Sequence, residues 1–289
     1  MHQRVNWLPK LVLSPSLALV LVFVYGFIVY TGYLSMTDSR MLPSYGWVGF
    51  ENYGKLWALS HWWTSLKNLG IFAGLYISVS LSLGLALAIL LDQKVRAEGF
   101  LRPVYLYPMA ISFIVTGVAW KWFLDPGIGL EHTLQHWGWT DFRFDWIKSR
   151  TMAIYTLVIA AVWQTSGFVM ALFLAGLRGV DDEILRAARI DGAPPFTIYR
   201  RIVLPMLAPV FLSALVVLAH TAIKSYDLVI AMTGGGPGRA TELPATFMYS
   251  YTFSRNQMGI GASSAVVMLM MVASIIIPYL YSDARARKP

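Results

Sequence analysis

Cysteine is absent from this 289-residue sequence, and charged residues are scarce. Without cysteine, the chain can form no disulfide, thiolate metal site or cysteine nucleophile. Charged residues make up 13% of the chain, compared with about 25% in an average soluble domain. Because hydrophobic residues make up 57%, this balance indicates a membrane protein rather than a soluble one.

Motifs for nucleotide binding and for hydrolysis are also missing. The sequence contains no G-x-S-x-G or H-E-x-x-H pattern and no P-loop. The glycine-rich stretch 233–244, TGGGPGRATELP, lacks the Lys-Ser/Thr pair that ends a P-loop, so we expect a tight, rigid turn there. Glu131, His132 and His136 could lie on one helical turn, but no further ligand accompanies them. We therefore expect no catalytic residues and no metal site in this chain.

Long apolar runs dominate the rest of the chain. A helix needs roughly 20 residues to cross the hydrocarbon core, and six segments of at least 18 residues contain no Asp, Glu, Lys or Arg. The first run is longer than the roughly 7–15 residues of a signal-peptide core, so we expect it to be retained. We predict an all-α membrane protein with six transmembrane helices. The predicted spans are about 11–37, 68–91, 103–120, 151–177, 202–223 and 256–282.

The basic residues are unevenly distributed between the two sides of these spans. Residues 1–10, 92–102, 178–201 and 283–289 belong to one side and hold 13 of the 23 Lys and Arg residues. Basic loops face the cytoplasm in most membrane proteins. We therefore predict that both termini are cytoplasmic, and we interpret the net charge of +8 as a topology signal rather than a nucleic-acid-binding one.

The loops expected on the outer side are aromatic. Residues 38–67 include VGFENYGKLW, an amphipathic stretch suited to a helix lying along the membrane surface. Residues 125–150 begin with DPGIGLEHTL and carry several tryptophans. Trp and Tyr favour the headgroup layer, so simple anchoring is the first interpretation of both loops. A docking surface for an external partner is the alternative.

Polar side chains occur within two of the predicted spans, where they are costly unless they face protein or water. If two such faces met, their amide, hydroxyl and aromatic groups would suit a neutral sugar. Alternatively, Gln164 and Thr165 bond only to neighbouring helices, and Lys224 forms an ion pair with Asp227. The candidate pathway residues are Trp163, Gln164, Thr165 and Phe168 in the fourth span, and His220, Thr221 and Lys224 in the fifth.

A polar, turn-rich segment separates the fourth and fifth spans. Asp181 or Asp182 is a suitable helix N-cap, and Glu183 adds negative charge to the first turn. Gly192 is a natural helix stop, and the Pro194-Pro195 pair can begin a second helix. Adjacent spans need only a short connection, so this long one predicts a further role. We predict a cytoplasmic helix-turn-helix over 178–205 that docks another protein.

This segment resembles the coupling loop of permease subunits in binding-protein-dependent carbohydrate ABC importers, the maltose-permease-like family. The family pattern is Glu-Ala-Ala, three residues, Gly, nine residues, then Ile-x-Leu-Pro, and AARIDGAPPFTIYRRIVLP follows it after the first position. VGFENY, DPGIGL and TGGGPGRATELPATFMY also resemble the carbohydrate branch, so the similarity covers nearly the whole chain. LDQKVRAEGFLRPVYLYPMAISFIVTGVAWKW and FMYSYTFSRNQMGIG are most similar to glucose/mannose importer permeases of Gram-negative bacteria.

The chain departs from the family pattern at Arg186, where the family has a glutamate. In the family that acid helps to anchor the loop in a cleft of the ATPase. Either Glu183, one turn earlier, supplies the negative charge, or the cognate ATPase differs at this contact. The coupling residues that the resemblance implies are Glu183, Arg186, Ala187, Ala188, Asp191, Gly192, Ile202, Leu204 and Pro205.

The resemblance implies a single transmembrane permease domain over 1–289, with the type I ABC importer fold, in a bacterial inner membrane. It also implies a second homologous permease subunit, two ATPases that bind ATP and magnesium, a periplasmic sugar-binding protein and surrounding lipid. No cofactor is expected on this chain, and ATP hydrolysis would belong to the partner, so the chain would be a transport subunit rather than an enzyme.

Three alternatives stay open. A stand-alone secondary sugar transporter would need ion-coupling charges that the spans lack. The chain could also be an ABC permease for another polyol, an oligosaccharide or glycerol phosphate. A membrane-embedded enzyme is disfavoured because no nucleophile or acid–base pair stands out.

Overall fold

The computed structural model describes residues 7–40, 44–93 and 97–286. The described residues form helices and turns, and their only strand-like feature is an isolated bridge between Thr37 and Trp47. The predicted all-α class is therefore confirmed. The chain folds as two compact units, one of residues 1–62 with 247–269 and the other of residues 63–246 with 270–289. The assignment of the whole chain to one transmembrane domain stays a prediction.

Four described helices are long and apolar enough to cross a membrane: Lys10–Ser35, Ser60–Asp92, Ala153–Leu177 and Met258–Tyr281. Two further candidates are bent pairs of helices, so the described part of the chain contains up to six spans if each pair counts as one. Each of the six predicted spans coincides with one of these candidates. The four straight helices begin and end within a few residues of the predicted spans at most ends, because charged residues bound the apolar runs. The span boundaries in a membrane stay a prediction.

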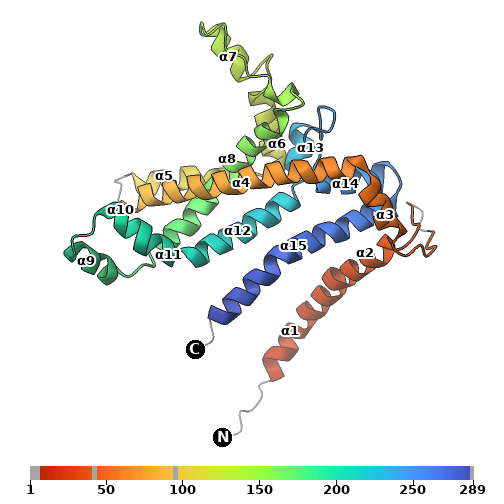
Figure 1. Ribbon diagram of the computed structural model, residues 1–289, viewed down its shortest axis with the longest axis horizontal. Helices are drawn as coiled ribbons and strands as arrows, with labels where there is room; N and C mark the ends of the chain where they lie inside the picture. The colour runs from red at the N-terminus through yellow and green to blue at the C-terminus, as the bar shows by residue number, and fades with distance from the viewer. Residues whose placement is uncertain (1–6, 41–43, 94–96, 287–289) are drawn as a thin grey trace. The chain divides into compact units, whose positions relative to one another are not determined.

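The first unit contains the first apolar helix and the short helix that follows it (Figure 1). Asn52 of α3 (Glu51–Ala58) is buried and holds the loop before it in place, since its side-chain amide donates to the carbonyls of Ser35 (2.9 Å) and Thr37 (2.7 Å). The amphipathic stretch in 38–67 therefore does form a helix, whereas its place at a membrane surface stays a prediction. The elements are α1 (Trp7–Val20), the π-helical turn Leu21–Gly26, α2 (Phe27–Ser35), α3 (Glu51–Ala58) and the π-helical turn Ser250–Ser254.

Close helix packing organises the second unit, where glycines permit the approach. A Cβ on Gly84 of α4 (Ser60–Asp92) would lie 2.6 Å from Val169 Cγ1 in α8 (Ala153–Leu177). A Cβ on Gly167 would collide with the carbonyl oxygen of Tyr105 in α5 (Glu98–Leu106). These close approaches place α8 at the centre of the unit, and sixteen of its 25 residues are buried.

The third predicted span is broken rather than continuous. Helix α5 and the 3₁₀ turn Tyr107–Ala110 meet α6 (Phe113–Phe123) at an angle of 100°. Ile111 and Ser112 are extended between them, and the Ser112 hydroxyl caps α6 by accepting from the amide of Val115 (3.3 Å). Ser112 therefore marks the start of a new helix inside a continuous apolar run, and the hydrophobic pattern alone does not reveal this boundary.

The fifth predicted span is bent by 63° between Pro195–Met206 and Ala208–Ile223. Proline explains the position, because Pro209 has no amide hydrogen to bond the carbonyl of Pro205 one turn earlier. The bend lies at Leu207, two residues after Pro205. Its elements are α10 (Pro195–Ile198), the π-helical turn Tyr199–Val203, α11 (Leu204–Met206) and α12 (Ala208–Ile223).

The remaining helices are short, apart from the last one. They are α7 (Leu130–His136), the 3₁₀ turn Trp146–Lys148, α9 (Asp182–Ile190), α13 (Asp227–Met232), α14 (Pro244–Tyr249) and α15 (Met258–Ala286).

Candidate functional site

The segment between α8 and α12 forms a helix, a left-handed turn and a second helix. The Asp181 side chain caps α9 by accepting from the amide of Glu183 at 2.8 Å. At the other end Gly192 has φ +76°, and nothing lies within 4 Å of the position that a Cβ would occupy there. The glycine is needed for its backbone conformation, therefore, and not for space. Pro195 then begins α10 with the φ angle that a helix requires.

Most of α9 is exposed. Ala188 is buried, whereas Glu183, Arg186, Ala187 and Asp191 face outward. Of the two predicted alanines, Ala188 therefore packs against the protein, whereas Ala187 is available to a partner.

Two large apolar side chains flank the left-handed turn. Ile190 is 86% exposed and Phe196 is 74% exposed, on either side of Gly192. Exposed apolar groups gathered on one small surface often mark a site of protein interaction. Ile190 was not among the predicted coupling residues, although an isoleucine two residues before the Gly192 stop, on an otherwise charged helix, was the available sign.

Arg186 has an acidic neighbour on its own helix. Its Nη2 lies 4.0 Å from Oδ2 of Asp182, one turn earlier, and both side chains are exposed. Such a pair contributes only about 0.3–0.5 kcal/mol. The side chain of Arg186 therefore remains free to contact a partner at little cost.

The last three predicted coupling residues lie in the bent segment rather than on α9. Ile202 and Leu204 are half-buried, Pro205 is exposed, and Val203 between them is buried. These positions determine how the chain enters α12, and they do not extend the exposed surface around Gly192.

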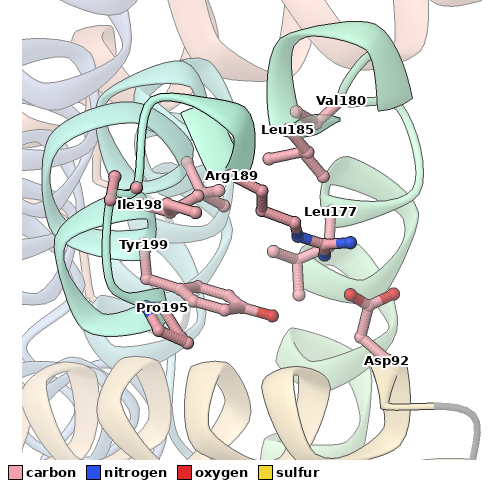
Figure 2. A pocket seen from close by; sticks show the side chains of 11 residues that line it. Asp92, Leu177, Val180, Leu185, Arg189, Pro195, Ile198 and Tyr199 are labelled. Atoms are coloured by element: carbon pink, nitrogen blue, oxygen red, sulfur yellow. The ribbon is translucent and has the colours of Figure 1, made fainter. Parts of the chain in front are cut away.

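A cavity of about 340 Å³ lies behind the coupling segment, between the end of α4, the end of α8, α9 and α10. Figure 2 shows the Arg189 guanidinium and the Tyr199 hydroxyl directed toward the Asp92 carboxylate, with apolar side chains around them. This cluster was not predictable from sequence patterns, because Asp92, Arg189 and Tyr199 come from three separate segments.

Arg178, which lies just before α9 in the sequence, joins three helix ends. Its Nη2 lies 2.6 Å from Oε1 of Glu98 at the start of α5, and its Nε lies 3.9 Å from Oδ1 of Asp92 at the end of α4. Because Arg178 is the C-cap of α8, this ionic cluster ties α4, α5 and α8 together three residues before the cap of α9.

Gln164 is buried at the helix break. Its side-chain amide donates to the carbonyl of Ile111 at 2.6 Å, which satisfies a backbone group that the break leaves unpaired. Its Oε1 is also buried and has no hydrogen-bond partner among the described residues. Gln164 therefore holds the break in place while leaving one acceptor unused.

The other predicted pathway residues of α8 lie around Gln164. The Thr165 hydroxyl donates to the carbonyl of Ala161 at 2.9 Å and lies 3.4 Å from the hydroxyl of Ser80 in α4. Trp163 packs edge-on against Trp120 with 5.9 Å between ring centroids, and Phe168 is half-buried.

The predicted pathway residues of the fifth span are more open. His220 and Lys224 are exposed, and the hydroxyl of half-buried Thr221 donates to the carbonyl of Val217 at 2.8 Å. Within the described ranges no ion pair joins Lys224 to Asp227. In the same ranges no hydrogen bond joins His220, Thr221 or Lys224 to Gln164 or Thr165.

Glu131, considered above as a metal ligand, is used by the fold instead. Its carboxylate accepts from the Phe144 amide (2.8 Å), from Gln135 (3.1 Å) and from Arg143 (3.3 Å). The hydrogen bond from the Phe144 amide lowers the pKa of Glu131 despite the opposing effect of burial, and Arg143 adds to the lowering. The carboxylate is thus a structural acceptor that holds Arg143 and Phe144 against α7.

These features define the class of protein: a multi-helix protein with up to six candidate membrane spans and an exposed helix-turn-helix between the fourth and fifth of them. The fold is that of an ABC importer permease, since it matches a chain of a bacterial alginate ABC transporter, solved in complex with an alginate pentasaccharide-bound periplasmic protein. The match has a TM-score of 0.83 at 18% identity and covers 98% of this chain and 96% of that chain.

The sequence comparisons identify the family. The family described as "Binding-protein-dependent transport system inner membrane component" matches residues 80–287, and the chain belongs to it. A probable ABC transporter permease protein of Pyrococcus horikoshii is 41% identical over 94% of each chain. A trehalose/maltose transport system permease protein of Thermococcus litoralis is 31% identical over 93% of this chain and 91% of its own.

Proposed function

We propose that this chain is the transmembrane subunit of an ATP-driven sugar importer and forms half of an alternating-access pathway with a second, homologous permease. The observation that carries the proposal is the exposed coupling surface, in which Ile190 and Phe196 flank the left-handed Gly192. A surface of this kind suits insertion into a cleft of a partner protein.

The partner at this surface would be an ATPase. Two such subunits would bind ATP and magnesium and would close on each other, moving α9 as a rigid body. The sequence has no P-loop of its own, so hydrolysis is assigned to the partner. The Arg178 cluster supports this role, because it links the base of α9 to the ends of α4 and α5.

Coupling to ATP places α9 in the cytoplasm, together with both termini. The distribution of Lys and Arg supports the same orientation. The opposite ends of the helices would then face the periplasm of a bacterial inner membrane, where a sugar-binding protein delivers its cargo.

The transported solute is proposed to be a neutral sugar, with glucose or mannose as the first candidate because of the resemblance described above. The relative from Thermococcus litoralis is a trehalose/maltose permease, which supports the broader class. Gln164 offers a buried acceptor, and Trp163 is 40% exposed beside Trp120. Hydrogen-bonding and aromatic groups together suit a polyol without net charge.

The test is uptake by the whole transporter with and without this subunit. Proteoliposomes that contain both permeases, the ATPase and the external binding protein should take up labelled glucose or mannose only with ATP inside. A panel with maltose and glycerol 3-phosphate assigns the solute. Transport by this chain without the ATPase would instead make it a stand-alone carrier and would overturn the proposal.

A further inference from the structure

A basic hollow of about 370 Å³ lies at the end of the second unit that is remote from α9. Three positively charged side chains line it, Lys67 from α4, Arg150 from the segment before α8, and Arg239 from the glycine-rich turn. All three are exposed, and no acidic side chain is among the described residues that line the hollow. The hollow therefore carries a concentrated positive charge.

The glycine-rich turn holds this charge in a defined position. Gly238 and Arg239 both have left-handed backbones, with φ +55° and +75°. A left-handed conformation is unusual for an arginine, and it persists only where the surroundings enforce it. Buried Asn68 enforces it here, because its side-chain amide donates to the carbonyls of Arg239 (3.1 Å) and Glu242 (3.0 Å).

Arg150 is held against the same turn. A Cβ on Gly238 would lie 3.2 Å from Arg150 Nε, so the guanidinium rests directly on the glycine backbone. Arg239 is partly neutralised by Glu242, with 3.7 Å between Nε and Oε2. In the described part of the chain no ion pair neutralises Lys67 or Arg150. These two side chains therefore supply most of the available charge.

The hollow and the coupling segment lie at opposite ends of α8. Arg150 and Thr151 precede the helix, whereas Arg178 caps its far end. With 25 residues, α8 is roughly 37 Å long, about the thickness of a membrane. If α9 meets an ATPase in the cytoplasm, the hollow opens to the external side.

We propose that this basic hollow is a docking site for an acidic side chain of the external binding protein. The inference rests on the proposed function, and it adds a defined contact on the outer face. A small anion is a less suitable occupant, because exposed cations hold a free ion weakly in water. A carboxylate on a protein surface arrives with further contacts, and complementary charge accelerates the encounter.

The test measures binding of the sugar-loaded binding protein to the complete transporter in nanodiscs. The double variant Lys67→Gln/Arg150→Gln should slow association roughly tenfold at low salt and flatten its salt dependence, while ATP hydrolysis without binding protein stays unchanged. Lys121→Gln is the matched control. Lys121 is an exposed cation at the end of α6 that does not line the hollow, so association should change less than twofold.

Charge exchange identifies the partner group. Arg150→Glu should weaken docking, and replacement of one acidic residue of the binding protein by lysine should restore it. Equal association of the wild type and the double variant would overturn the docking site alone, whereas a wild-type complex that binds no binding protein would overturn the proposed function with it. If the double variant binds more slowly only in nanodiscs that contain phosphatidylglycerol, the hollow would be assigned to lipid instead. If inorganic phosphate abolishes docking of the binding protein to the wild type, the hollow would be assigned to a free anion.

Discussion

The left-handed turn at Gly192 permits a prediction with a defined magnitude. Gly192 has φ +76°, and a Cβ there would meet nothing within 4 Å, so a substitution is penalised by backbone strain alone. Alanine in this conformation costs about 1–2 kcal/mol, and asparagine costs less. Proline cannot adopt it at all, and would also remove the hydrogen bond from the Gly192 amide to the Arg189 carbonyl (3.1 Å).

This strain should appear as weaker ATPase association. A helix of nine residues is unstable by itself, so α9 can relieve strain at its end by unwinding. Docking must then restore the helix. Since 1.4 kcal/mol corresponds to about a factor of 10, Gly192→Ala should weaken association roughly 5- to 30-fold. Gly192→Asn should weaken it only a few-fold, and Gly192→Pro should abolish it.

The assay is titration of the purified ATPase against the permease complex in nanodiscs, with the amount of inserted permease measured in the same samples. Gly138→Ala is a matched control, since Gly138 also has a left-handed backbone (φ +101°) with open space around it but lies beyond α7. It should leave ATPase association unchanged. If Ala and Asn at position 192 weaken binding equally, or if neither does, the backbone argument is refuted.

Three further predictions follow from side-chain contacts. Gln164→Leu leaves the Ile111 carbonyl unpaired at the helix break, so it should destabilise the complex by about 1–3 kcal/mol in thermal unfolding. In transport assays it should lower uptake without changing ATPase association. Arg178→Ala should hardly change stability, because exposed ion pairs contribute about 0–1 kcal/mol, but should reduce sugar transported per ATP hydrolysed, with Arg178→Lys intermediate. The Phe144 amide lowers the pKa of Glu131, so its ionised form stabilises residues 125–150 above the ordinary glutamate pKa. That stabilisation is lost as pH falls through the lowered pKa, and limited proteolysis of this segment should accelerate in acid for the wild type but not for Glu131→Gln.

Local features of the chain were predictable from sequence. Charged residues bound the apolar runs, and a capping aspartate, a glycine stop and a proline start mark the helices of the coupling segment within a few residues of their boundaries. Each of these signals acts through neighbours in sequence. They identified the helical class and the elements of the coupling segment.

Features that depend on distant residues were not predictable. The break at Ile111 is stabilised by Gln164, 53 residues later, so the third span looked continuous. The Arg178 cluster joins α4, α5 and α8, and Arg178 lies about 80 residues after Asp92 and Glu98 in the chain, so no local pattern indicates it. The use of Glu131 as a structural acceptor likewise depends on an amide 13 residues away.

The apolar side chains beside the coupling turn have a consequence for the life of the subunit before assembly. Because Ile190 and Phe196 are largely exposed, a newly inserted permease would present an apolar patch to the aqueous compartment. Chains made in excess over the ATPase would self-associate or be recognised as orphans by chaperones and proteases. Balanced synthesis of the subunits would therefore be a requirement of this surface, and expression of the permease alone would give low yields that recover when the ATPase is co-produced.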